Sequence, residues 1–282
     1  MSSKVIGLAF ALATGLALNS HNVAAATIAE VFAKHKAGST ATVDHSAWDK
    51  LLKKYVKPDR VGLNRVDYRG FKAKDHGALK AYVKALEATN VARLGKAEQF
   101  AFWVNLYNAK TVDVILDYYP VDSIRKITIK AGLFGILKSS VGAGGPWKAK
   151  IMKVAGMDLS LDDIEHGILR PIFRDPRIHY AVNCASIGCP NLRRAAFTGS
   201  NLEASLEAGA RDYINSPRGI STAGGKIQAS SIYKWFQVDF GGNQQGVLKH
   251  VRKYAQGKIK APLERARGID GFAYDWGLND HK

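Results

Sequence analysis

The sequence predicts an α+β fold, in which a single mixed domain of helices and short strands surrounds a central aromatic helix. Segments with helical and with strand-like periodicity alternate irregularly along the 282 residues, and few of them follow the strand–helix–strand order of a doubly wound sheet. The segment 96–120 is long, apolar at helical spacing and rich in aromatic residues. Because no repeat or long linker divides the sequence, we expect one domain, which is long enough for one large core or two small ones.

The first 25 residues have the features of a cleaved secretory signal peptide. Lys4 precedes the apolar run IGLAFALATGLAL, and small residues follow it. The run has 13 residues, fewer than the roughly 20 that a membrane span needs, so we expect no transmembrane segment. We therefore predict a signal peptide at 1–25, cleaved near Ala25 or Ala26, an N-terminal arm at 26–43 and the domain at 44–282. The protein is expected to be exported, either to the periplasm or outside the cell.

The formal net charge is +17. A positive field of this size attracts anions. For an exported protein, the expected partners are an anionic polymer of the cell envelope or lipid head groups. The sequence contains no helix-turn-helix or RNA-binding signature, so we do not expect a nucleic-acid partner.

Apolar periodicity and breaker residues predict the individual elements. Helices are expected at 45–56, 77–89, 96–120, 159–170, 200–217 and 243–257, with Pro120 and Pro171 ending two of them and Ser160 capping the fourth. A hairpin is expected at 147–159, a strand at 177–184, and a strand followed by a short helix, capped near Ser230 or Ser231, at 225–240. The segment 271–280 is read as extended. The glycine-rich stretch 133–146 lacks a phosphate-binding pattern and is read as a mobile loop.

The two cysteines of the chain, Cys184 and Cys189, lie close together in HYAVNCASIGCPNL. In an oxidising compartment such a pair can form a disulfide. Two thiolates can also supply half of a zinc site, for which His166 and His179 are the nearest histidines in sequence. The third alternative is a nucleophilic thiolate, which needs a base and a group that lowers its pKa. The sequence leaves all three open.

Two histidines are candidates for the base. If 177–184 is a strand, His179 and Cys184 point to opposite faces and lie far apart, which makes His179 the poorer base. His166 comes from a separate helix that tertiary packing can bring to Cys184. Its neighbour Glu165 points about 100° away around that helix and cannot orient its ring.

Asn105 and Asn108 lie three residues apart on one face of the aromatic helix. Asparagine is a poor residue in the middle of a helix, and a buried amide needs hydrogen-bond partners. These two side chains either bond to neighbouring loops and fix the core, or line a site and orient a histidine or a substrate carbonyl. Arg170 either pairs with a carboxylate or binds an anion in a pocket.

Several of these stretches together resemble one family. FWVNLYNA, LSLDDIEHGILR, RIHYAVNCASIGCPNL, KWFQVDF and the closing YDWGLN are similar to the family catalogued as domain of unknown function 547, from about Asp44 to Asn279. The resemblance implies a set of motif residues, which are Asn105, Tyr107, Asn108, Glu165, His166, Arg170, His179, Asn183, Cys184, Ser186, Cys189 and Pro190. It supports treating these residues as one constellation and implies no reaction.

A cysteine, two histidines and several amides have the composition of a thiol acyl-transfer site. Our hypothesis is that Cys184 is the nucleophile and His166 the base, with Asn108 or Asn105 as orienter and the loop after Cys184 offering N–H groups to an oxyanion. Glu165 and His179 complete the candidate catalytic set, and Asn105, Arg170, Asn183 and Ser186 are candidate binding residues. The substrate is expected to be an amide or ester in the cell envelope, and no cofactor or metal is expected.

The alternative hypothesis is a non-enzymatic protein that binds anionic glycan or lipid. In that case the Cys184–Cys189 pair is a structural disulfide and the polar constellation is a core network. A zinc site at the cysteines is a third option.

Overall fold

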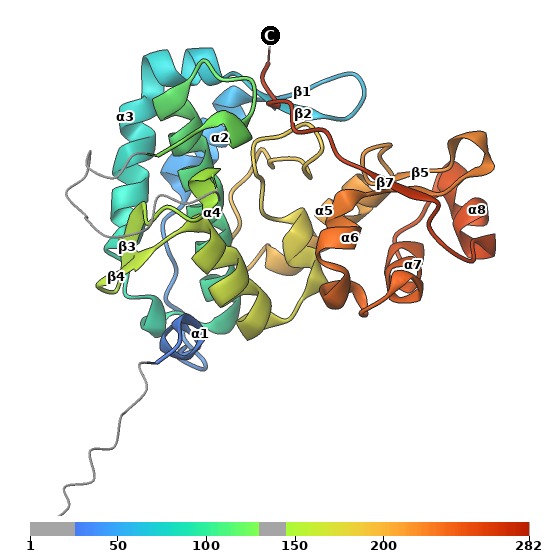
Figure 1. Cartoon of the computed structure of the whole chain (residues 1–282). Helices are drawn as coiled ribbons and strands as arrows, with labels where there is room; N and C mark the ends of the chain where they lie inside the picture. The colour runs from blue at the N-terminus through green and yellow to red at the C-terminus, as the bar shows by residue number, and fades with distance from the viewer. Residues whose placement is uncertain (1–25, 130–144, 282) are drawn as a thin grey trace, which may run out of the picture.

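The computed structural model describes residues 26–129 and 145–281, and it has the predicted α+β fold (Figure 1). The predicted signal peptide at 1–25 and all but the last two residues of the predicted glycine-rich loop at 133–146 lie outside the described residues. Within the described part, no helix combines the length and the apolar character that a membrane span requires.

The N-terminal part of the chain is mainly helical and carries two small antiparallel hairpins. Its helices are α1 (Ile28–Phe32), α2 (Ser46–Tyr55), α3 (Tyr68–Glu87) and α4 (Lys96–Tyr118), and its strands are β1 (Val56–Pro58), β2 (Asn64–Val66), β3 (Met152–Val154) and β4 (Met157–Leu159). The pairs Val56↔Val66 and Met152↔Leu159 set the registers of β1–β2 and β3–β4. The helices predicted at 45–56 and 96–120 and the hairpin predicted at 147–159 are confirmed.

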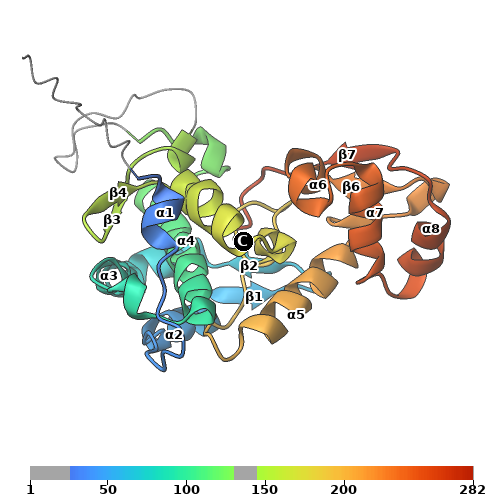
Figure 2. The ribbon, with the colours of Figure 1, turned by 90° about the horizontal axis from the view of Figure 1, so that it is seen from below.

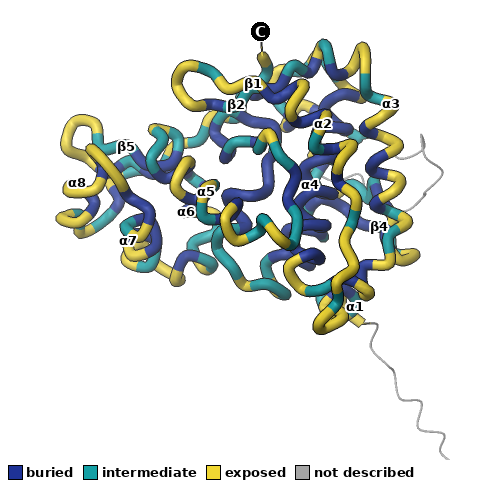
Figure 3. The backbone as a smooth tube through the Cα atoms, turned by 180° about the vertical axis from the view of Figure 1, so that it is seen from behind, coloured by how far each residue is buried: buried dark blue, intermediate teal, exposed yellow. Residues whose placement is uncertain are grey.

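Helix α4 is the predicted central helix and is buried around nearly its whole circumference (Figure 3). Phe102, Trp103 and Leu106 are fully buried in a hydrophobic cluster that also takes in α2 and α3. A helix that is apolar on all sides is stable only inside a core, which explains its position. Helix α3 packs directly against α4, and α2 packs against α3.

The helix predicted at 159–170 is correctly placed, but its end is wrong. The segment η4 (Asp163–Phe173) is π-helical and continues through Pro171. The predicted end at Pro171 assumed α-helical geometry, in which a proline loses a hydrogen bond and clashes with the preceding turn, and this segment does not have that geometry. The predicted cap is present, because Ser160 Oγ accepts the Asp163 N–H at 3.1 Å. Single π turns occur frequently at functional sites.

The strand predicted at 177–184 is wrong. Its first half belongs to the 3₁₀ helix η5 (Pro176–Tyr180), and the rest is a turn and loop. Asp175 accepts the Arg177 N–H and Pro176 occupies the first helical position, so local capping outweighs the β-branched, aromatic pattern. Because His179 lies in a 3₁₀ helix, strand geometry does not separate it from Cys184.

The C-terminal part builds a second hydrophobic cluster around a three-stranded sheet. Its helices are α5 (Leu202–Ile214), α6 (Ser231–Trp235), α7 (Gln244–Arg252) and α8 (Lys260–Arg265), and its strands are β5 (Ile220–Ser221), β6 (Gln228–Ser230) and β7 (Gly271–Ala273). Strand β6 pairs antiparallel with β5 and parallel with β7. The prediction of a strand followed by a Ser230-capped helix is confirmed. Short 3₁₀ turns connect the elements: η1 (Val91–Arg93), η2 (Ile124–Lys126), η3 (Gly145–Trp147), η6 (Ala223–Gly225), η7 (Gln237–Phe240) and η8 (Gly257–Ile259).

The last residues of the chain run back from β7 to the N-terminal part (Figure 1). On the way, Leu278 forms an antiparallel bridge with Ser186, and Asp280 forms a parallel bridge with Val66. Figure 2 shows the middle of the chain, in yellow, lying between the N-terminal helices and the C-terminal elements. The loop that carries both cysteines is therefore held from two sides.

Candidate functional site

A pocket of about 190 Å³ opens beside the cysteine loop, and it collects most of the predicted catalytic residues. Its walls come from α4, η4, η5, the cysteine loop, α6 and the segment after β7. The lining residues are Tyr107, Trp147, Asp162, Glu165, His166, His179, Val182, Cys184, Cys189, Ile232, Trp235, Phe236, Tyr274 and Trp276. The structure thus brings Cys184, Glu165, His166 and His179 together, as the sequence hypothesis requires.

The two asparagines of α4 act as clamps on backbone and orient no histidine. Asn105 donates to Phe197 O at 2.7 Å and accepts the Phe197 N–H at 3.1 Å. Asn108 donates to Ala181 O at 2.9 Å and accepts the Asn183 N–H at 2.8 Å. Both amides are satisfied by these bonds, so the structure supports the first of the two alternatives, in which they fix loops onto the core.

Asn183 clamps the cysteine loop in the same way. Its Nδ2 donates to Pro190 O at 2.6 Å, and its Oδ1 accepts the Ala185 N–H at 2.9 Å. Ala185 has a φ of +61°, an unusual conformation for a residue with a side chain. Backbone strain of this kind is frequent at functional sites and needs support from its surroundings, which the clamp provides.

The Cys184 thiol is half-buried and has three partners within hydrogen-bonding distance. Its Sγ lies 3.1 Å from Cys189 Sγ, 3.0 Å from Tyr274 Oη and 3.3 Å from Ser186 Oγ. Ser186 and Tyr274 also bond to each other at 2.8 Å. Both cysteines are free thiols. Sequence reasoning anticipated Ser186 but missed Tyr274, which reaches the site only because the chain returns from β7.

These partners act on the acidity of Cys184. The hydrogen bond from Cys189 outweighs the effect of burial, and those from Ser186 and Tyr274 add to it, so the pKa of Cys184 falls to about 7. Burial raises the pKa of the Cys189 thiol, and its bond to Cys184 raises it further. Burial likewise keeps the pKa of Tyr274 well above its ordinary value, so Tyr274 remains a donor. At neutral pH a large fraction of Cys184 is thiolate.

This acidity predicts a pH profile for alkylation. The rate of Cys184 labelling by iodoacetamide is expected to rise with a midpoint near pH 7, because the thiolate is the reactive form. In Tyr274→Phe the midpoint should move to higher pH, since one donor to the thiolate is lost. Peptide mapping after short exposures at pH 5 to 10 measures both. A wild-type midpoint near 8.5, that of an ordinary cysteine, would contradict the lowered pKa of Cys184, and an unchanged midpoint in Tyr274→Phe would contradict the assigned role of Tyr274.

His179 lies between two carboxylates deep in the pocket. Its Nε2 is 2.7 Å from Asp239 Oδ2, and its Nδ1 is 3.7 Å from Glu165 Oε1. Arg170 binds the same Asp239 through two bonds, from Nε and Nη2. His179 also stacks on Phe236, with ring centroids 4.2 Å apart. Arg170 thus pairs with a carboxylate, which is the first of its two predicted roles. Asp239 is a site residue that sequence reasoning missed, although it lies in the segment KWFQVDF.

Burial and hydrogen bonding divide the protons among these groups. Burial would raise the pKa of Asp239, but hydrogen bonds from His179 and Arg170 outweigh it and lower the pKa to about 2. Burial lowers the pKa of His179 despite Asp239, so the imidazole is neutral. Since an ionised Asp239 can only accept, His179 carries its proton on Nε2 and leaves Nδ1 free to accept. Burial raises the pKa of Glu165, although His166 and the Tyr107 hydroxyl oppose it.

His166 lines the pocket mouth, but it is placed less well for the role of base. Its Nδ1 accepts from Arg170 Nη1 at 3.2 Å, and its Nε2 lies 3.9 Å from Asp162 Oδ1. Among the described residues, no hydrogen bond joins either histidine to Cys184. The assignment of His166 as base remains a prediction, and the geometry offers Glu165 as a more buried alternative.

In the loop after Cys184, which is expected to offer N–H groups to an oxyanion, those of Ala185, Ile187, Gly188 and Cys189 already donate within the protein. Antiparallel pairing with the C-terminal segment, which the sequence did not reveal, uses two of them. The Ser186 N–H is not among these donating groups, and for this group the expectation stays a prediction. The hydroxyls of Ser186 and Tyr274 are the remaining donors at the sulfur.

One side of the pocket is an aromatic wall formed by Trp147, Trp235, Tyr274 and Trp276. Ring centroids of Tyr274 and Trp276 are 4.7 Å apart, and those of Trp235 and Tyr274 are 4.9 Å apart. Trp235 remains 47% exposed, which is high for such a large apolar side chain. Exposed aromatic surface next to polar groups is typical of a ligand pocket. The wall was not predicted, because its members are distant in sequence.

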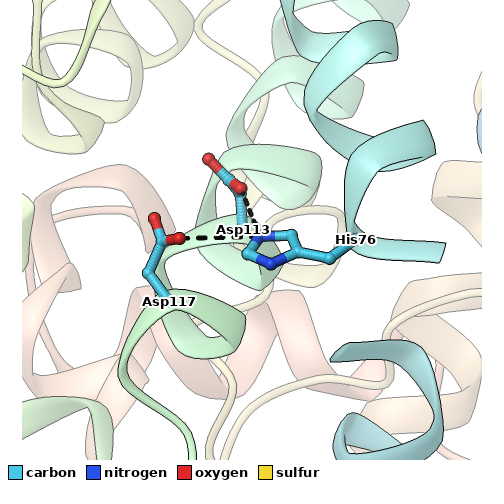
Figure 4. A group of neighbouring side chains, drawn as sticks. All are labelled: His76, Asp113 and Asp117. Carbon is cyan, nitrogen blue, oxygen red and sulfur yellow. Dashed lines mark hydrogen bonds and ion pairs between the residues drawn. The ribbon is translucent and has the colours of Figure 1, made fainter. Parts of the chain in front are cut away.

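A second cluster of acidic and histidine side chains lies outside the pocket, on α3 and α4 (Figure 4). His76 Nε2 lies 2.8 Å from Asp113 Oδ1 and 3.7 Å from Asp117 Oδ1, a spacing that would suit a metal ion. However, Lys80 lies 2.9 Å from Asp113 and 3.0 Å from Asp117, and Lys110 lies 2.9 Å from Asp113. The two ammonium groups already balance the carboxylates, so we read this cluster as a salt-bridge network. In the described part of the chain, neither Cys184 nor Cys189 belongs to a group of side chains close enough together to hold a metal ion.

Comparison with known families confirms the resemblance over part of the chain. Residues 91–214 match the model of a family described as "Protein of unknown function, DUF547". No curated protein and no solved structure matches the chain. The matched span contains Cys184, Glu165 and His179, whereas Asp239, Trp235 and Tyr274 lie beyond it.

Proposed function

We propose, with the DUF547 resemblance as the premise, that the protein is a cysteine-dependent hydrolase or acyl transferase acting on an amide or ester in the cell envelope. The observation that supports this most is the Cys184 thiol, whose pKa is lowered to about 7 by three neighbouring donors inside a pocket that also holds a buried carboxyl. A nucleophile and an acid–base group in one pocket are the minimum for acyl transfer. The aromatic wall favours a substrate with an apolar group beside the scissile bond.

In the first step, the Cys184 thiolate attacks the carbonyl carbon and a C–S bond forms. The bond from that carbon to the leaving oxygen or nitrogen breaks, and the leaving group takes the proton of the Glu165 carboxyl. The raised pKa of Glu165 favours this role, because burial stabilises the protonated carboxyl, which is the form that can act as an acid. The hydroxyls of Ser186 and Tyr274 are the donors available to the transient oxyanion.

In the second step, water or an acceptor alcohol or amine attacks the thioester. Glu165, now a carboxylate, takes the proton of the attacking group, and the C–S bond breaks to release the thiolate. His179 Nδ1, 3.7 Å from Glu165, faces the carboxyl that changes protonation in both steps. Asp239 and Arg170 hold that imidazole in place.

The experiment that tests the proposal is acylation of Cys184 by an activated ester. With p-nitrophenyl acetate, we expect a burst of nitrophenol and an acetyl adduct on Cys184, located by peptide mapping. Cys184→Ser should lose both burst and adduct. Cys189→Ser keeps the nucleophile and places a hydroxyl beside it, so it should still form the adduct on Cys184, at a rate that reflects the changed hydrogen bond. Equal acetylation of the two cysteines, or acetylation of surface lysines alone, would refute the proposal.

A second candidate function is binding of an anionic envelope polymer or lipid head group. It is favoured by the net charge of +17 and by a further pocket of about 380 Å³, lined by Arg193 and Arg194 among others. Arg193 Nε is buried there without a hydrogen-bond partner. The protein is then expected to bind vesicles containing phosphatidylglycerol, and the binding should weaken strongly from low to high salt. Co-sedimentation at two salt concentrations measures it, and binding that is absent or insensitive to salt excludes this function.

A further inference from the structure

The two thiols offer chemistry that the proposed acyl transfer does not use. We propose that Cys184 and Cys189 form an oxidant-responsive pair, in which a hydroperoxide drives a reversible disulfide. Insofar as the proposed function holds, this disulfide also blocks the nucleophile.

Cys189 is held against Cys184 by two contacts. Its Sγ lies 3.1 Å from Cys184 Sγ and accepts the Cys184 N–H, also at 3.1 Å. A covalent S–S bond is about 2.05 Å long, so the sulfurs need to approach by only about 1 Å. The pair is therefore arranged for closure before any oxidant arrives.

The loop between the two cysteines is fixed at both ends, which keeps the sulfurs together. Asn183 spans it, from the Ala185 N–H to Pro190 O. Arg218 Nη1 donates to Cys189 O from the C-terminal part of the chain. Little chain entropy remains to be lost when the ring closes, because the backbone is already ordered.

The two thiols differ in the way that a two-step oxidation requires. Cys184 lines the pocket, is half-buried and has the lower pKa, so it supplies the thiolate that attacks a peroxide. Cys189 is buried, and its pKa is raised. It stays a thiol until an electrophilic sulfur forms beside it, and it then acts as the resolving group.

Oxidation of the cysteine pair takes two steps. The Cys184 thiolate attacks one oxygen of the hydroperoxide, the O–O bond breaks, and an alkoxide leaves that takes a proton from water to become an alcohol. Cys184 becomes a sulfenic acid. The Cys189 sulfur then attacks the Cys184 sulfur, the S–O bond breaks, and water leaves with the Cys189 proton. A dithiol such as dithiothreitol reverses the change and is itself oxidised to a disulfide.

The test is treatment of the reduced full-length chain with a stoichiometric amount of cumene hydroperoxide, followed by alkylation and intact-mass measurement. We expect a monomer lighter by two hydrogens that accepts no alkyl group, and recovery of two alkylated thiols after dithiothreitol. In Cys189→Ser, oxidation should stop at a sulfenic acid on Cys184 that dimedone traps. Cys184→Ser should react with peroxide at least about tenfold more slowly, because the buried thiol that remains is protonated.

Persistence of both thiols, irreversible oxidation of Cys184, or only intermolecular dimers in the wild-type chain would overturn the inference. Acetylation by p-nitrophenyl acetate, measured on the reduced and the oxidised protein, separates the two proposals. If the reduced protein is acetylated but peroxide forms no disulfide, only the pair inference fails. If the disulfide forms but the reduced protein is never acetylated, the proposed function fails and the pair remains.

Discussion

Glu165→Gln is expected to slow turnover of a p-nitrophenyl ester or amide by about 10²–10⁴-fold, the usual contribution of a general acid–base group. Glutamine keeps the size of the side chain and can still accept from the Tyr107 hydroxyl, which bonds Glu165 Oε2 at 3.2 Å. It cannot give a proton to a leaving group or take one from water. Steady-state release of nitrophenol and the lifetime of the acyl adduct measure the effect, and the adduct should live longer in the variant.

Alkylation of Cys184 provides the control for this variant. Glutamine carries no negative charge that could raise the pKa of Cys184, so labelling of Cys184 at neutral pH should not slow in the variant. His166→Ala is the matched comparison at the pocket mouth. If His166→Ala loses turnover by 10²-fold or more and Glu165→Gln does not, His166 is the acid–base group of the original hypothesis, and our assignment of Glu165 is incorrect.

Asn108→Ala is expected to lower the free energy of unfolding by roughly 2–6 kcal/mol. The amide satisfies two buried backbone groups, Ala181 O and the Asn183 N–H, and each such group left without a partner costs about 1–3 kcal/mol. Urea unfolding followed by circular dichroism measures the change. Because Asn183 precedes Cys184, the variant should also loosen the cysteine loop and alter its labelling rate.

Two variants test the specificity of this effect. Asn90→Ala lies at an exposed position without a capping hydrogen bond and should change stability by less than about 0.5 kcal/mol. Asn105→Ala removes the equivalent clamp on Phe197 and should destabilise by a similar amount as Asn108→Ala, while the cysteine loop keeps its own clamp. If Asn108→Ala keeps both the free energy of unfolding and the Cys184 labelling rate of the wild type, the two hydrogen bonds of Asn108 do not stabilise the protein or the cysteine loop.

The local elements were predictable where side-chain periodicity and breakers agree. Helix α4 is apolar on every side and ends before Pro120. In the hairpin of β3 and β4, apolar and polar residues alternate on both sides of a glycine turn. Both elements were therefore predicted correctly. Prediction failed where a short capping motif or an unusual helix overrides the pattern. Asp175 and Pro176 start a 3₁₀ helix in a segment that reads as a strand, and the π turns of η4 accommodate Pro171.

Sequence alone determined the α+β class and the central aromatic helix, because each depends on the periodicity of short stretches. The family resemblance implied which residues to treat as one constellation. Only the tertiary structure decided which of those residues touch. In the folded chain His179 contacts Asp239, Asn105 and Asn108 bind backbone groups of distant loops, and the Tyr274 hydroxyl lies beside the Cys184 sulfur. The physical reason is that these contacts join segments 60 to 92 residues apart, and their partners are set by how the whole chain packs and not by any local pattern.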